Sequence, residues 1–412
     1  MTAAEPSAPS GPPGRWLSIV GIGEDGADGL SPRARRLVEA AELLFGGQRH
    51  LELAAALIRG ETRAWPSPFS IEPVLAARGR RTCVLASGDP FLHGVGATLA
   101  RQLPAAEMEV VPAPSAFSLA AARLGWPLQD TVTLSLHGRP VDLLRPHLHP
   151  GTRLLVLTSD GDGPAGVARL LVEAGFGATP VTVLEALGGP DELIRSVSAA
   201  DFAMDAVNPL NLVALEVKAG AGSRVLPLTP GLDDRLFEHD GQLTKREIRA
   251  LTLAALAPRR GELLWDIGAG AGSIAIEWML RDPSLRAIAI EARADRAQRI
   301  PRNAARLGVP GLRLVVGEAP TALAGLPTPD AVFIGGGGAD RGLMQAAVAA
   351  LPSGGRLVAN AVTLETEAVL LAHHAELGGS LLRVAVSRAG EVGGMTGWRP
   401  AMPVTQWCWT KP

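Results

Sequence analysis

The sequence of 412 residues contains only two cysteines, Cys83 and Cys408, and each lies inside an apolar run. Neither a disulfide framework nor a cage of thiolate metal ligands can be built from them. The close histidine pairs at 147/149 and 373/374 lack the spacing that zinc hydrolases use. We therefore expect no protein-bound metal and a reducing, cytoplasmic environment.

Neither sign of charge is in excess, because 39 Lys and Arg residues stand against 41 Asp and Glu residues. A general nucleic-acid binder needs a cationic surface that releases counterions from the phosphate backbone. No window approaches the roughly 18 uninterrupted apolar residues of a membrane span. Residues 1–14 lack the cationic start and the apolar stretch of a signal peptide. We expect a disordered tail at 1–14 and a soluble protein whose partner is a small molecule, not nucleic acid or a membrane.

From Trp16 onward, short β-rich runs alternate with stretches rich in Ala, Leu and Arg. Helices are expected at 32–44 and 95–102, and strands at 16–20, 82–86, 108–111, 131–136, 153–158, 180–184 and 211–217. This alternation predicts parallel α/β layers. Two successive α/β lobes fit a first domain over residues 15–217.

Small residues and prolines fill the stretch 218–231, which cannot sustain a helix and is expected to be a linker. A second domain, 232–412, has expected strands at 263–267, 287–290, 313–316, 331–334 and 356–359. A helical stretch follows each of them, as in a doubly wound sheet. The runs 381–387 and 404–410 are separated only by a Gly-rich loop, so they should pair antiparallel.

The strongest local signal is the segment from Asp266 to Ser273, which reads D-I-G-A-G-A-G-S. An apolar strand ends there in glycines at every second position, and a helix is expected at 274–280. Glycines let the backbone approach a ligand closely, and a helix N-terminus offers free N–H groups. The dinucleotide fingerprint needs its third glycine at position 273, where Ser273 stands, so NAD is disfavoured.

This loop resembles motif I of the S-adenosylmethionine methyltransferases of seven-stranded Rossmann type. The resemblance implies that the loop, comprising Gly268, Ala269, Gly270, Ala271 and Gly272, carries the methionine end of the cofactor. Glu291 ends the next strand about 20 residues on, where an acidic side chain can accept hydrogen bonds from both ribose hydroxyls. Residues 317–320 end the third strand, where the resemblance places the adenine. The alternative is that these motifs are ordinary tight turns that bind no ligand. Three such motifs at successive strand ends make this alternative less favourable.

The first domain contains four further motifs. They are a strand running into Gly21 and Gly23, a Gly/Pro turn at 86–94, the segment 111–121 and the segment 208–213. Together they resemble the tetrapyrrole methylase family, whose members bind S-adenosylmethionine in a cleft between two α/β lobes. Residues 21–26 read G-I-G-E-D-G where that family usually has G-x-G-P-G-D. The implied cofactor contacts are Gly21, Asp89, Gly94, Ser115, Ser118 and Asn211.

A tetrapyrrole methylase half followed by a Rossmann methyltransferase half is a specific order, and residues 241–249 add a further match. From about 16 to 410 the chain is similar to a bifunctional methyltransferase family of cobalamin synthesis. The resemblance implies methylation of carbons 5 and 15 of a precorrin-6 macrocycle, loss of carbon dioxide from the ring C acetate, and precorrin-8 as product. It also implies two S-adenosylmethionine sites per chain, self-association, and cofactor contacts in the second half at Thr244, Glu318 and Ala319.

A precorrin carries many carboxylates, so its binding site should be basic. Candidates beside the second cofactor loop are Arg341, Arg388 and Arg399, with a solvated surface role as the alternative for each. In the first half, His137 and Arg139 could bind carboxylates in the same way. The residues do not identify a general base.

The sequence disfavours two other functions. A nucleic-acid methyltransferase is disfavoured by the charge balance and by the absence of an Asn/Asp-Pro-Pro-aromatic motif after the fourth strand, where 334–338 reads I-G-G-G-G. A non-catalytic cofactor sensor would need a degenerate loop, and only the first loop departs from its family.

Overall fold

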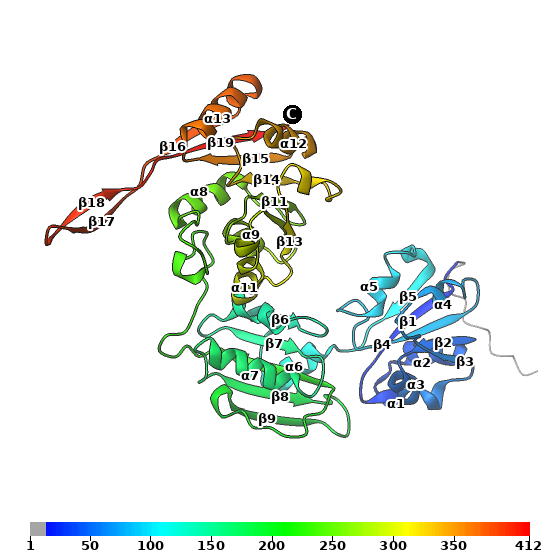
Figure 1. Ribbon diagram of the computed structural model, residues 1–412. Coiled ribbons are helices and arrows are strands. Elements are labelled where there is room, and N and C mark those ends of the chain that lie inside the picture. Colours follow the sequence, from blue (N-terminus) through cyan, green and yellow to red (C-terminus); the bar gives the residue numbers. More distant parts are fainter. Residues whose placement is uncertain (1–13) are drawn as a thin grey trace, which may run out of the picture. The chain divides into compact units, whose positions relative to one another are not determined.

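The computed structural model describes residues 14–412 (Figure 1). The expected tail at 1–14 therefore lies outside the described residues, except for its last position. The chain forms two compact units, of which the first runs to residue 139 and includes 149–223. The second unit combines 140–148 with 224–412.

The first unit begins with a parallel five-stranded sheet in the order β3-β2-β4-β1-β5. Its strands are β1 (Leu17–Ile22), β2 (Leu43–Gly46), β3 (Glu61–Ala64), β4 (Thr82–Ser87) and β5 (Met108–Val111). The helical segments of this lobe are α1 (Gly26–Gly29), α2 (Pro32–Ala40), α3 (Gln48–Leu53), η1 (Ala55–Leu57), α4 (Glu72–Leu75), α5 (Val95–Leu99) and η2 (Ala105–Glu107). Parallel strands bring their carboxyl ends to one edge of the sheet.

The prediction of a helix at 32–44 is wrong at the C-terminal end, because α2 stops at Ala40 and β2 begins at Leu43. Leu43, Leu44 and Phe45 are all buried on the two faces of the sheet. A continuous apolar run of this length fits a buried helix or a buried strand equally well. Contacts with strands distant in the sequence decide between the two.

The second lobe of the first unit is a sheet in the order β6-β7-β10-β8-β9. Its strands are β6 (Thr131–Ser135), β7 (Arg153–Leu157), β8 (Pro180–Glu185), β9 (Leu193–Ser198) and β10 (Asn211–Glu216). The helical segments are α6 (Ala116–Leu124), η3 (Leu128–Asp130), α7 (Gly163–Glu173) and η5 (Ala199–Asp201). Only β6 and β7 are parallel, and the other pairs are antiparallel. The expectation of parallel layers is therefore wrong for this lobe.

The second unit is built on a seven-stranded sheet in the order β13-β12-β11-β14-β15-β19-β16. Five strands are parallel: β11 (Leu263–Ile267), β12 (Arg286–Glu291), β13 (Arg313–Val316), β14 (Ala331–Ile334) and β15 (Arg356–Ala361). β19 (Val404–Thr410) pairs antiparallel with both β15 and β16 (Ser380–Val384), which confirms the antiparallel pairing expected for the last two runs. The sheet is thus mostly parallel with an antiparallel edge.

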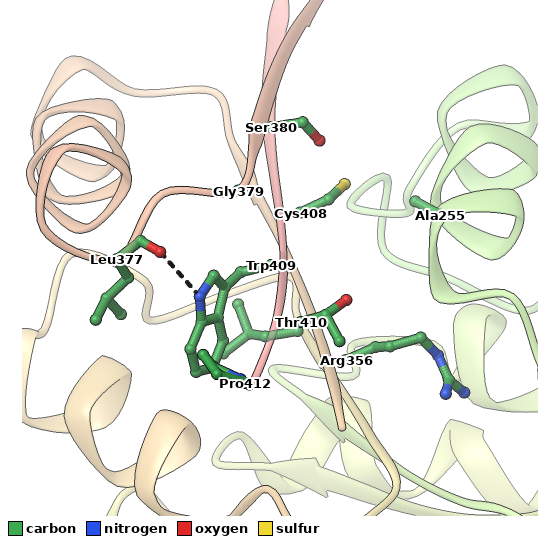
Figure 2. A pocket seen from close by; sticks show the side chains of 10 residues that line it. Ala255, Arg356, Leu377, Gly379, Ser380, Cys408, Trp409, Thr410 and Pro412 are labelled. Atoms are coloured by element: carbon green, nitrogen blue, oxygen red, sulfur yellow. Dashed lines mark hydrogen bonds between the residues drawn. The ribbon is translucent and has the colours of Figure 1, made fainter. Parts of the chain in front are cut away.

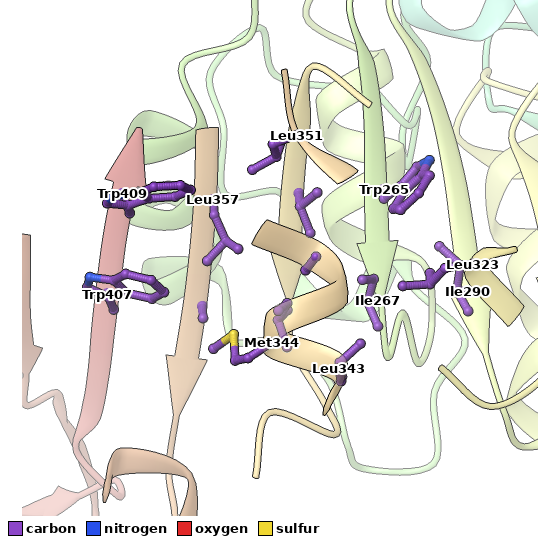
Figure 3. Close-up of a cluster of buried hydrophobic side chains, with 14 of the residues drawn as sticks. Trp265, Ile267, Ile290, Leu323, Leu343, Met344, Leu351, Leu357, Trp407 and Trp409 are labelled. Atoms are coloured by element: carbon purple, nitrogen blue, oxygen red, sulfur yellow. The ribbon is translucent and has the colours of Figure 1, made fainter. Parts of the chain in front are cut away.

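Helices cover both faces of this sheet. The side chains of α8 (Arg246–Leu256), α9 (Ser273–Met279) and α11 (Arg299–Arg306) enter one apolar core. Those of α12 (Arg341–Ala350) and α13 (Leu364–Leu377) enter the other, which Figure 3 shows with Trp407 and Trp409 of β19. The remaining helical segments of the unit are η4 (Val141–His147), η6 (Asp234–Leu236), α10 (Ala294–Ala297) and η7 (Thr321–Leu323).

The Gly-rich segment between β16 and β19, expected to be a loop, is instead the antiparallel hairpin of β17 (Ser387–Val392) and β18 (Met395–Pro400). Figure 1 shows it extending from the sheet of the second unit. Gly393 and Gly394 form its turn with φ of +59° and +79°. A two-residue hairpin turn with both φ values positive favours glycine, so these glycines close a hairpin.

The division into units differs from the expected domain limits in the segment 140–148, which packs with the second unit. Within that unit, a Cβ on Gly308 would lie 2.3 Å from Pro146 Cδ, so η4 and the end of α11 are in close contact. Within residues 14–412, no helix has the combined length and apolar character needed to cross a bilayer.

Candidate cofactor and substrate sites

The glycine loop of the second unit lies at the carboxyl edge of its parallel strands. Ile267, the last residue of β11, is level with Ile290 of β12 and Ile334 of β14. The loop 268–272 therefore begins at the height of Glu291 on one side and Gly335 on the other. The carboxyl edge of an open α/β sheet is the usual place for a ligand.

Three glycines shape this loop, and all have positive φ: +69° at Gly268, +59° at Gly270 and +77° at Gly272. A Cβ on Gly268 would lie 2.6 Å from the backbone nitrogen of Gly336, and one on Gly272 would lie 3.0 Å from Ile300. A Cβ on Gly270 would meet only the Gln242 carbonyl, at 3.9 Å. The outer glycines are thus required by packing, while Gly270 borders open space.

Glu291 connects the loop to the next strand. Its Oε2 accepts the Gly270 N–H at 2.7 Å, and its Oε1 accepts the Arg293 N–H at 2.9 Å. The side chain is buried. Each carboxylate oxygen has a second lone pair, so Glu291 can still accept hydrogen bonds from ligand hydroxyls.

Asp266, the acidic residue of the motif, was not selected from the sequence as a site residue. Its Oδ2 accepts the Ala275 N–H at 3.0 Å, whereas its buried Oδ1 has no hydrogen-bond partner. Burial raises the pKa of Asp266 to about 7, and the nearby charge of Glu291 acts in the same direction. An acceptor atom beside the loop is thus left unsatisfied.

Asn303 on α11 holds the loop from the other side, and nothing in the sequence indicates this role. Its Nδ2 donates to the carbonyls of Ala271 and Glu238, each at 3.0 Å, and its Oδ1 accepts the Glu238 N–H at 2.8 Å. The side chain is fully buried. Asn303 therefore fixes the loop to the segment that precedes α8.

Arg249 of α8 and Glu277 of α9 form a fully buried ion pair, 2.5 Å between Nε and Oε1. Glu277 also accepts the Gly231 N–H at 2.7 Å. Arg249 donates to the carbonyl of Thr244 and to Asp234. This pair fixes the chain entering the second unit, and with it the position of Thr244.

The other cofactor contacts expected in this unit fall near the same edge. Gly317 donates its N–H to the Glu291 carbonyl at 3.1 Å, which places the turn after β13 beside the acidic residue. Glu318 in that turn is exposed, and Ala319 is half-buried against the apolar core. The structure therefore brings together the glycine loop, Glu291 and residues 317–319. Thr244 lies two residues after Gln242, whose carbonyl faces Gly270.

The three candidate carboxylate binders are all exposed. Arg341 begins α12, three residues after the last of the glycines that follow β14. Arg388 and Arg399 are cross-strand partners on the β17–β18 hairpin. Arg388 forms an ion pair with Glu247 of α8, and Arg399 donates to the Glu391 carbonyl.

In the first unit, the turn motifs form close backbone contacts. A Cβ on Gly21 would lie 1.9 Å from the Gly88 carbonyl oxygen, and one on Gly94 would lie 2.5 Å from that of Pro90. Asp89 Oδ1 accepts the Phe91 N–H at 2.9 Å and so shapes its own turn. Glycine is thus required at 21 and 94 by packing, with or without a ligand.

Ser115, Ser118 and Asn211 also make internal hydrogen bonds. Ser115 caps α6 by accepting the Ser118 N–H at 3.1 Å, and the two hydroxyls are 2.9 Å apart. Asn211 is buried, and its Nδ2 donates to the carbonyls of Asp160 and Asn208 at 2.8 Å. Both hydrogens of this amide are used, so Asn211 first of all holds the loop after β7.

A cavity of about 440 Å³ lies elsewhere in the second unit. Figure 2 shows residues that line it, among them Arg356 and Thr410. Arg356 begins β15 and pairs with Thr410. The cavity therefore lies at the amino end of β15, away from the glycine loop. The Arg356 guanidinium already donates to the Leu256 carbonyl and to Glu262.

Three features define the class of this protein: the mostly parallel seven-stranded sheet, the glycine loop after β11 and the acidic Glu291 at the end of β12. Together they are typical of the S-adenosylmethionine-dependent methyltransferases. A family model described as "Precorrin methyltransferase domain" matches residues 235–411. A model described as "Tetrapyrrole (Corrin/Porphyrin) Methylases" matches residues 17–203.

Three curated relatives narrow the assignment within this class of methyltransferases. A precorrin-6Y C(5,15)-methyltransferase [decarboxylating] from Sinorhizobium sp is 63% identical over 398 residues, which is 96% of each chain. A cobalt-precorrin-7 C(5)-methyltransferase from Salmonella typhimurium is 32% identical over 197 residues, 46% of this chain and 96% of that protein. A probable cobalt-precorrin-6B C(15)-methyltransferase (decarboxylating) from Pyrobaculum calidifontis is 36% identical over 170 residues, 40% of this chain and 79% of that protein. The chain belongs to the family of decarboxylating precorrin-6Y C(5,15)-methyltransferases, enzymes of cobalamin biosynthesis.

Proposed function

We propose that this chain methylates carbons 5 and 15 of a precorrin-6 macrocycle, removes the carboxyl group of the ring C acetate as carbon dioxide, and so forms precorrin-8. The observation that carries the proposal is the 63% identity to a relative of that name over 96% of both chains. The glycine loop and Glu291 support it, because they keep the geometry that a methyltransferase cofactor needs.

The two halves divide the work. Two shorter relatives support this, since one is named for the C(5) methylation alone and the other for the C(15) methylation with decarboxylation. We assign methylation of carbon 5 to the tetrapyrrole methylase half. Methylation of carbon 15 and the decarboxylation belong to the Rossmann-type half.

Each half binds its own S-adenosylmethionine, which supplies an electrophilic methyl group when bound. In the second unit the fit rests on the open space at Gly270 and the unpartnered Oδ1 of Asp266. The backbone of 268–272 holds the methionine end, and Glu291 accepts hydrogen bonds from the ribose. The adenine lies against Glu318 and Ala319, and Thr244 closes the site from the start of α8.

In the first unit, the cofactor lies at the carboxyl edge of the parallel lobe. Gly21 and Gly94 permit the close backbone packing that shapes the turns facing the cofactor. Asp89 lies in one of these turns, Ser115 packs against Gly88 of the same turn, and Ser118 is bonded to Ser115. Asn211 contributes from the position where it holds the loop after β7. Their hydrogen bonds within the chain hold these turns in place, and the lone pairs that remain on the hydroxyl and carboxylate oxygens are available to the cofactor.

In the second unit, arginines bind the substrate carboxylates. Arg341 is best placed, because it lies three residues after the last of the glycines that follow β14 and no hydrogen bond to its side chain competes among the contacts described. Arg388 and Arg399 contribute from the hairpin, with Arg388 exchanging Glu247 for a substrate carboxylate. Transfer of the reacting carboxylate from water to an apolar surrounding favours loss of neutral carbon dioxide, with the conjugated macrocycle as electron sink.

The remaining proposals concern the whole protein. The domains extend over 15–217 and 232–412 with a linker at 218–231, and the segment 140–148 of the first domain packs with the second unit. The chain acts as a cytoplasmic homo-oligomer without a nucleic-acid partner. The small net charge of −2 supports the absence of nucleic acid. Separate expression of the two domains, followed by circular dichroism, tests the domain limits.

The direct test of the function uses S-adenosylmethionine labelled in its methyl group, with precorrin-6 and with tRNA as acceptors. The proposal expects label in the precorrin and none in the tRNA. Label in tRNA alone would establish the alternative, a nucleic-acid methyltransferase. Binding of the cofactor without transfer to either acceptor would point to a sensor.

A further inference from the structure

Four polar side chains gather at the carboxyl edge of the first parallel sheet. They come from the loop after β1, from the first turn of α3 and from the end of β4, and they are Glu24, Arg49, His50 and Ser87. None of them was selected from the sequence. Ser87 is exposed and His50 is half-buried.

This cluster adjoins the turns where we place the first cofactor. Ser87 is level with Ile22 at the end of β1, and the next residue, Gly88, accepts the Ala113 N–H at 3.1 Å. A Cβ on Gly88 would lie 3.0 Å from Ser115 Cα. The Ser87 hydroxyl is therefore at the same edge as the proposed cofactor contacts.

The direction of the hydrogen bonds in the cluster follows from chemistry. His50 Nε2 lies 2.8 Å from Ser87 Oγ and 3.1 Å from Arg49 Nη2, which is also 3.2 Å from Ser87 Oγ. A guanidinium can only donate, so Nε2 must be the acceptor and Nδ1 carries the proton of the neutral ring. The Ser87 hydroxyl then donates to Nε2 as well.

Ser87 thus presents oxygen lone pairs, and no proton, to the surface. Arg49 forms an ion pair with Glu24, which offsets its positive charge. A substrate carboxylate would need free donors and uncompensated positive charge, and the cluster offers neither at Ser87. Its chemistry suits a group that gives up a proton.

His50 is held in its neutral form. Burial, together with the charge of Arg49, lowers the pKa of His50 to about 4. Nδ1 is buried and has no hydrogen-bond partner, so nothing in the chain stabilises a charged ring there. A proton taken up by this imidazole would be released again quickly.

The other titratable groups around α3 do not change this balance. Among the elements that pack most closely on it, β2 and η1 carry none. β4 carries Cys83, whose thiol pKa burial raises to about 12. Asp28 on α1 is fully exposed, and on β3 Glu61 and Arg63 are paired with each other.

We infer that Ser87 and His50 form the proton acceptor for the methylation in the first unit, an inference that rests on the proposed function. The methyl–sulfur bond breaks and its electron pair stays on sulfur, while π electrons of the macrocycle form the new carbon–carbon bond. The C–H bond at the methylated carbon then breaks, and its electrons return to the macrocycle. The Arg49 N–H moves from His50 Nε2 to Ser87 Oγ, which it also contacts, and so frees the single lone pair of Nε2. The proton from carbon goes to Ser87 Oγ as the hydroxyl proton of Ser87 moves to His50 Nε2, and water finally takes the proton from His50.

A weak base suffices for this step, because the carbon acid belongs to a cationic conjugated system. Ser87 contacts the reacting atoms, and His50 acts through Ser87. The order of roles resembles that of serine and histidine in hydrolases, but the hydroxyl here relays a proton and forms no covalent bond.

The experiment measures carbon-5 methylation by the full chain with Ser87→Ala, His50→Gln and a control, Ser70→Ala. Ser70 lies in the same lobe, and its hydroxyl only accepts the Glu72 N–H. We expect kcat for carbon-5 methylation to fall about 100-fold or more in the two test variants, the range of general-base catalysis. KM for the cofactor, carbon-15 methylation and the Ser70 variant should stay at wild-type values. The double variant should lose no more than the worse single variant, because both residues serve one step.

Two further readouts separate a relay from a structural role. In the wild type, kcat for carbon-5 methylation should be constant between about pH 6 and 9 and fall below about pH 5, where His50 becomes protonated. His50→Gln should remove that acidic limb. In ¹⁵N NMR spectra of the ligand-free chain, His50 should carry its proton on Nδ1, and Ser87→Ala should shift only the Nε2 resonance.

A proton on Nε2, or an unchanged kcat in Ser87→Ala, overturns the relay. A rise in KM with constant kcat would also contradict it, since that pattern belongs to a binding residue. A wild-type chain that methylates no precorrin contradicts the proposed function and this inference with it, whereas wild-type rates in both variants contradict this inference alone.

Discussion

The carboxylate of Glu291 accepts the backbone N–H of Gly270, with 2.7 Å between Oε2 and the amide nitrogen. A residue expected to bind ribose thus also fixes the centre of the glycine loop. Its other oxygen accepts the Arg293 N–H, so both oxygens are anchored before any ligand binds. The second lone pairs of these oxygens are then held in fixed directions, which favours tight binding of a diol.

Replacement of Glu291 by Ala should weaken cofactor binding at the second site alone. The pair of ribose hydroxyls would lose its acceptor, at a total cost of about 1 to 3 kcal/mol when the hydroxyls are buried and left unpaired. Titration calorimetry should then show a loss of roughly 5- to 150-fold in affinity at that site. Glu376→Ala is the control, because Glu376 is exposed on α13 and belongs to neither proposed cofactor site. Wild-type affinity in Glu291→Ala would contradict the assignment.

Gly270→Val should abolish cofactor binding at the second site while the unit stays folded. The side chain would enter the open space at the loop, and φ of +59° adds strain of about 1 to 3 kcal/mol. Gly354→Val is the control, since Gly354 has φ of +78° and nothing within 4 Å of an added Cβ. Both variants should lose similar stability in urea unfolding, but only Gly270→Val should lose the cofactor. Equal loss of cofactor affinity in both variants would mean that backbone strain causes the loss, and not a valine side chain that fills the ligand space.

The glycine loop could be predicted from the sequence because its signals are local. Alternate glycines after an apolar run specify positive φ at three positions, and the structure has all three. Buried parallel strands such as 263–267 and 331–334 could also be predicted, since continuous apolar runs are typical of them. Register along a parallel sheet then placed Glu291 at the height of the loop.

Long-range partners could not be predicted in this way. Asn303 holds Ala271 from 32 positions away in the sequence, and Arg249 meets Glu277 across 28 positions. No local pattern marks such pairs. The predictions for the end of α2 and for the strand directions in the second lobe were wrong for the same reason. Neighbours distant in the sequence decide whether an apolar run forms a helix or a strand, and they also decide in which direction a strand runs.

Asp266 should make stability depend on pH. Its pKa in the folded chain is raised to about 7, above its ordinary value, so the folded state binds a proton that the unfolded state has released. The free energy of unfolding should therefore fall as pH rises from about 4 to about 7, at about 1.4 kcal/mol per pH unit between the two pKa values. Asp266→Asn should remove this contribution while its side-chain oxygen still accepts the Ala275 N–H. Urea unfolding at several pH values gives the comparison, and identical pH dependence in both chains would refute it.

Breaking the Arg249–Glu277 pair should destabilise the second unit strongly. Arg249→Met leaves a buried, uncompensated carboxylate, which costs about 3 to 5 kcal/mol. The double variant Arg249→Met/Glu277→Met should be less destabilised than the sum of the single variants, because it leaves no lone charge. The change should also weaken the second cofactor site, since Arg249 holds the Thr244 carbonyl. Additive losses in urea unfolding would show that the two residues do not act as a pair.

The central claim is that two cofactor sites in one chain carry out separate methylations of one macrocycle. Mass spectrometry of the product from precorrin-6 with wild type, Gly270→Val and Ser87→Ala tests it most directly. The account predicts that wild type adds two methyl groups and removes one carbon dioxide. Gly270→Val should give a product that lacks the carbon-15 methyl group and keeps the ring C carboxyl group, and Ser87→Ala should accumulate a product that lacks only the carbon-5 methyl group. Loss of both methyl groups to the same degree in each variant would contradict the account.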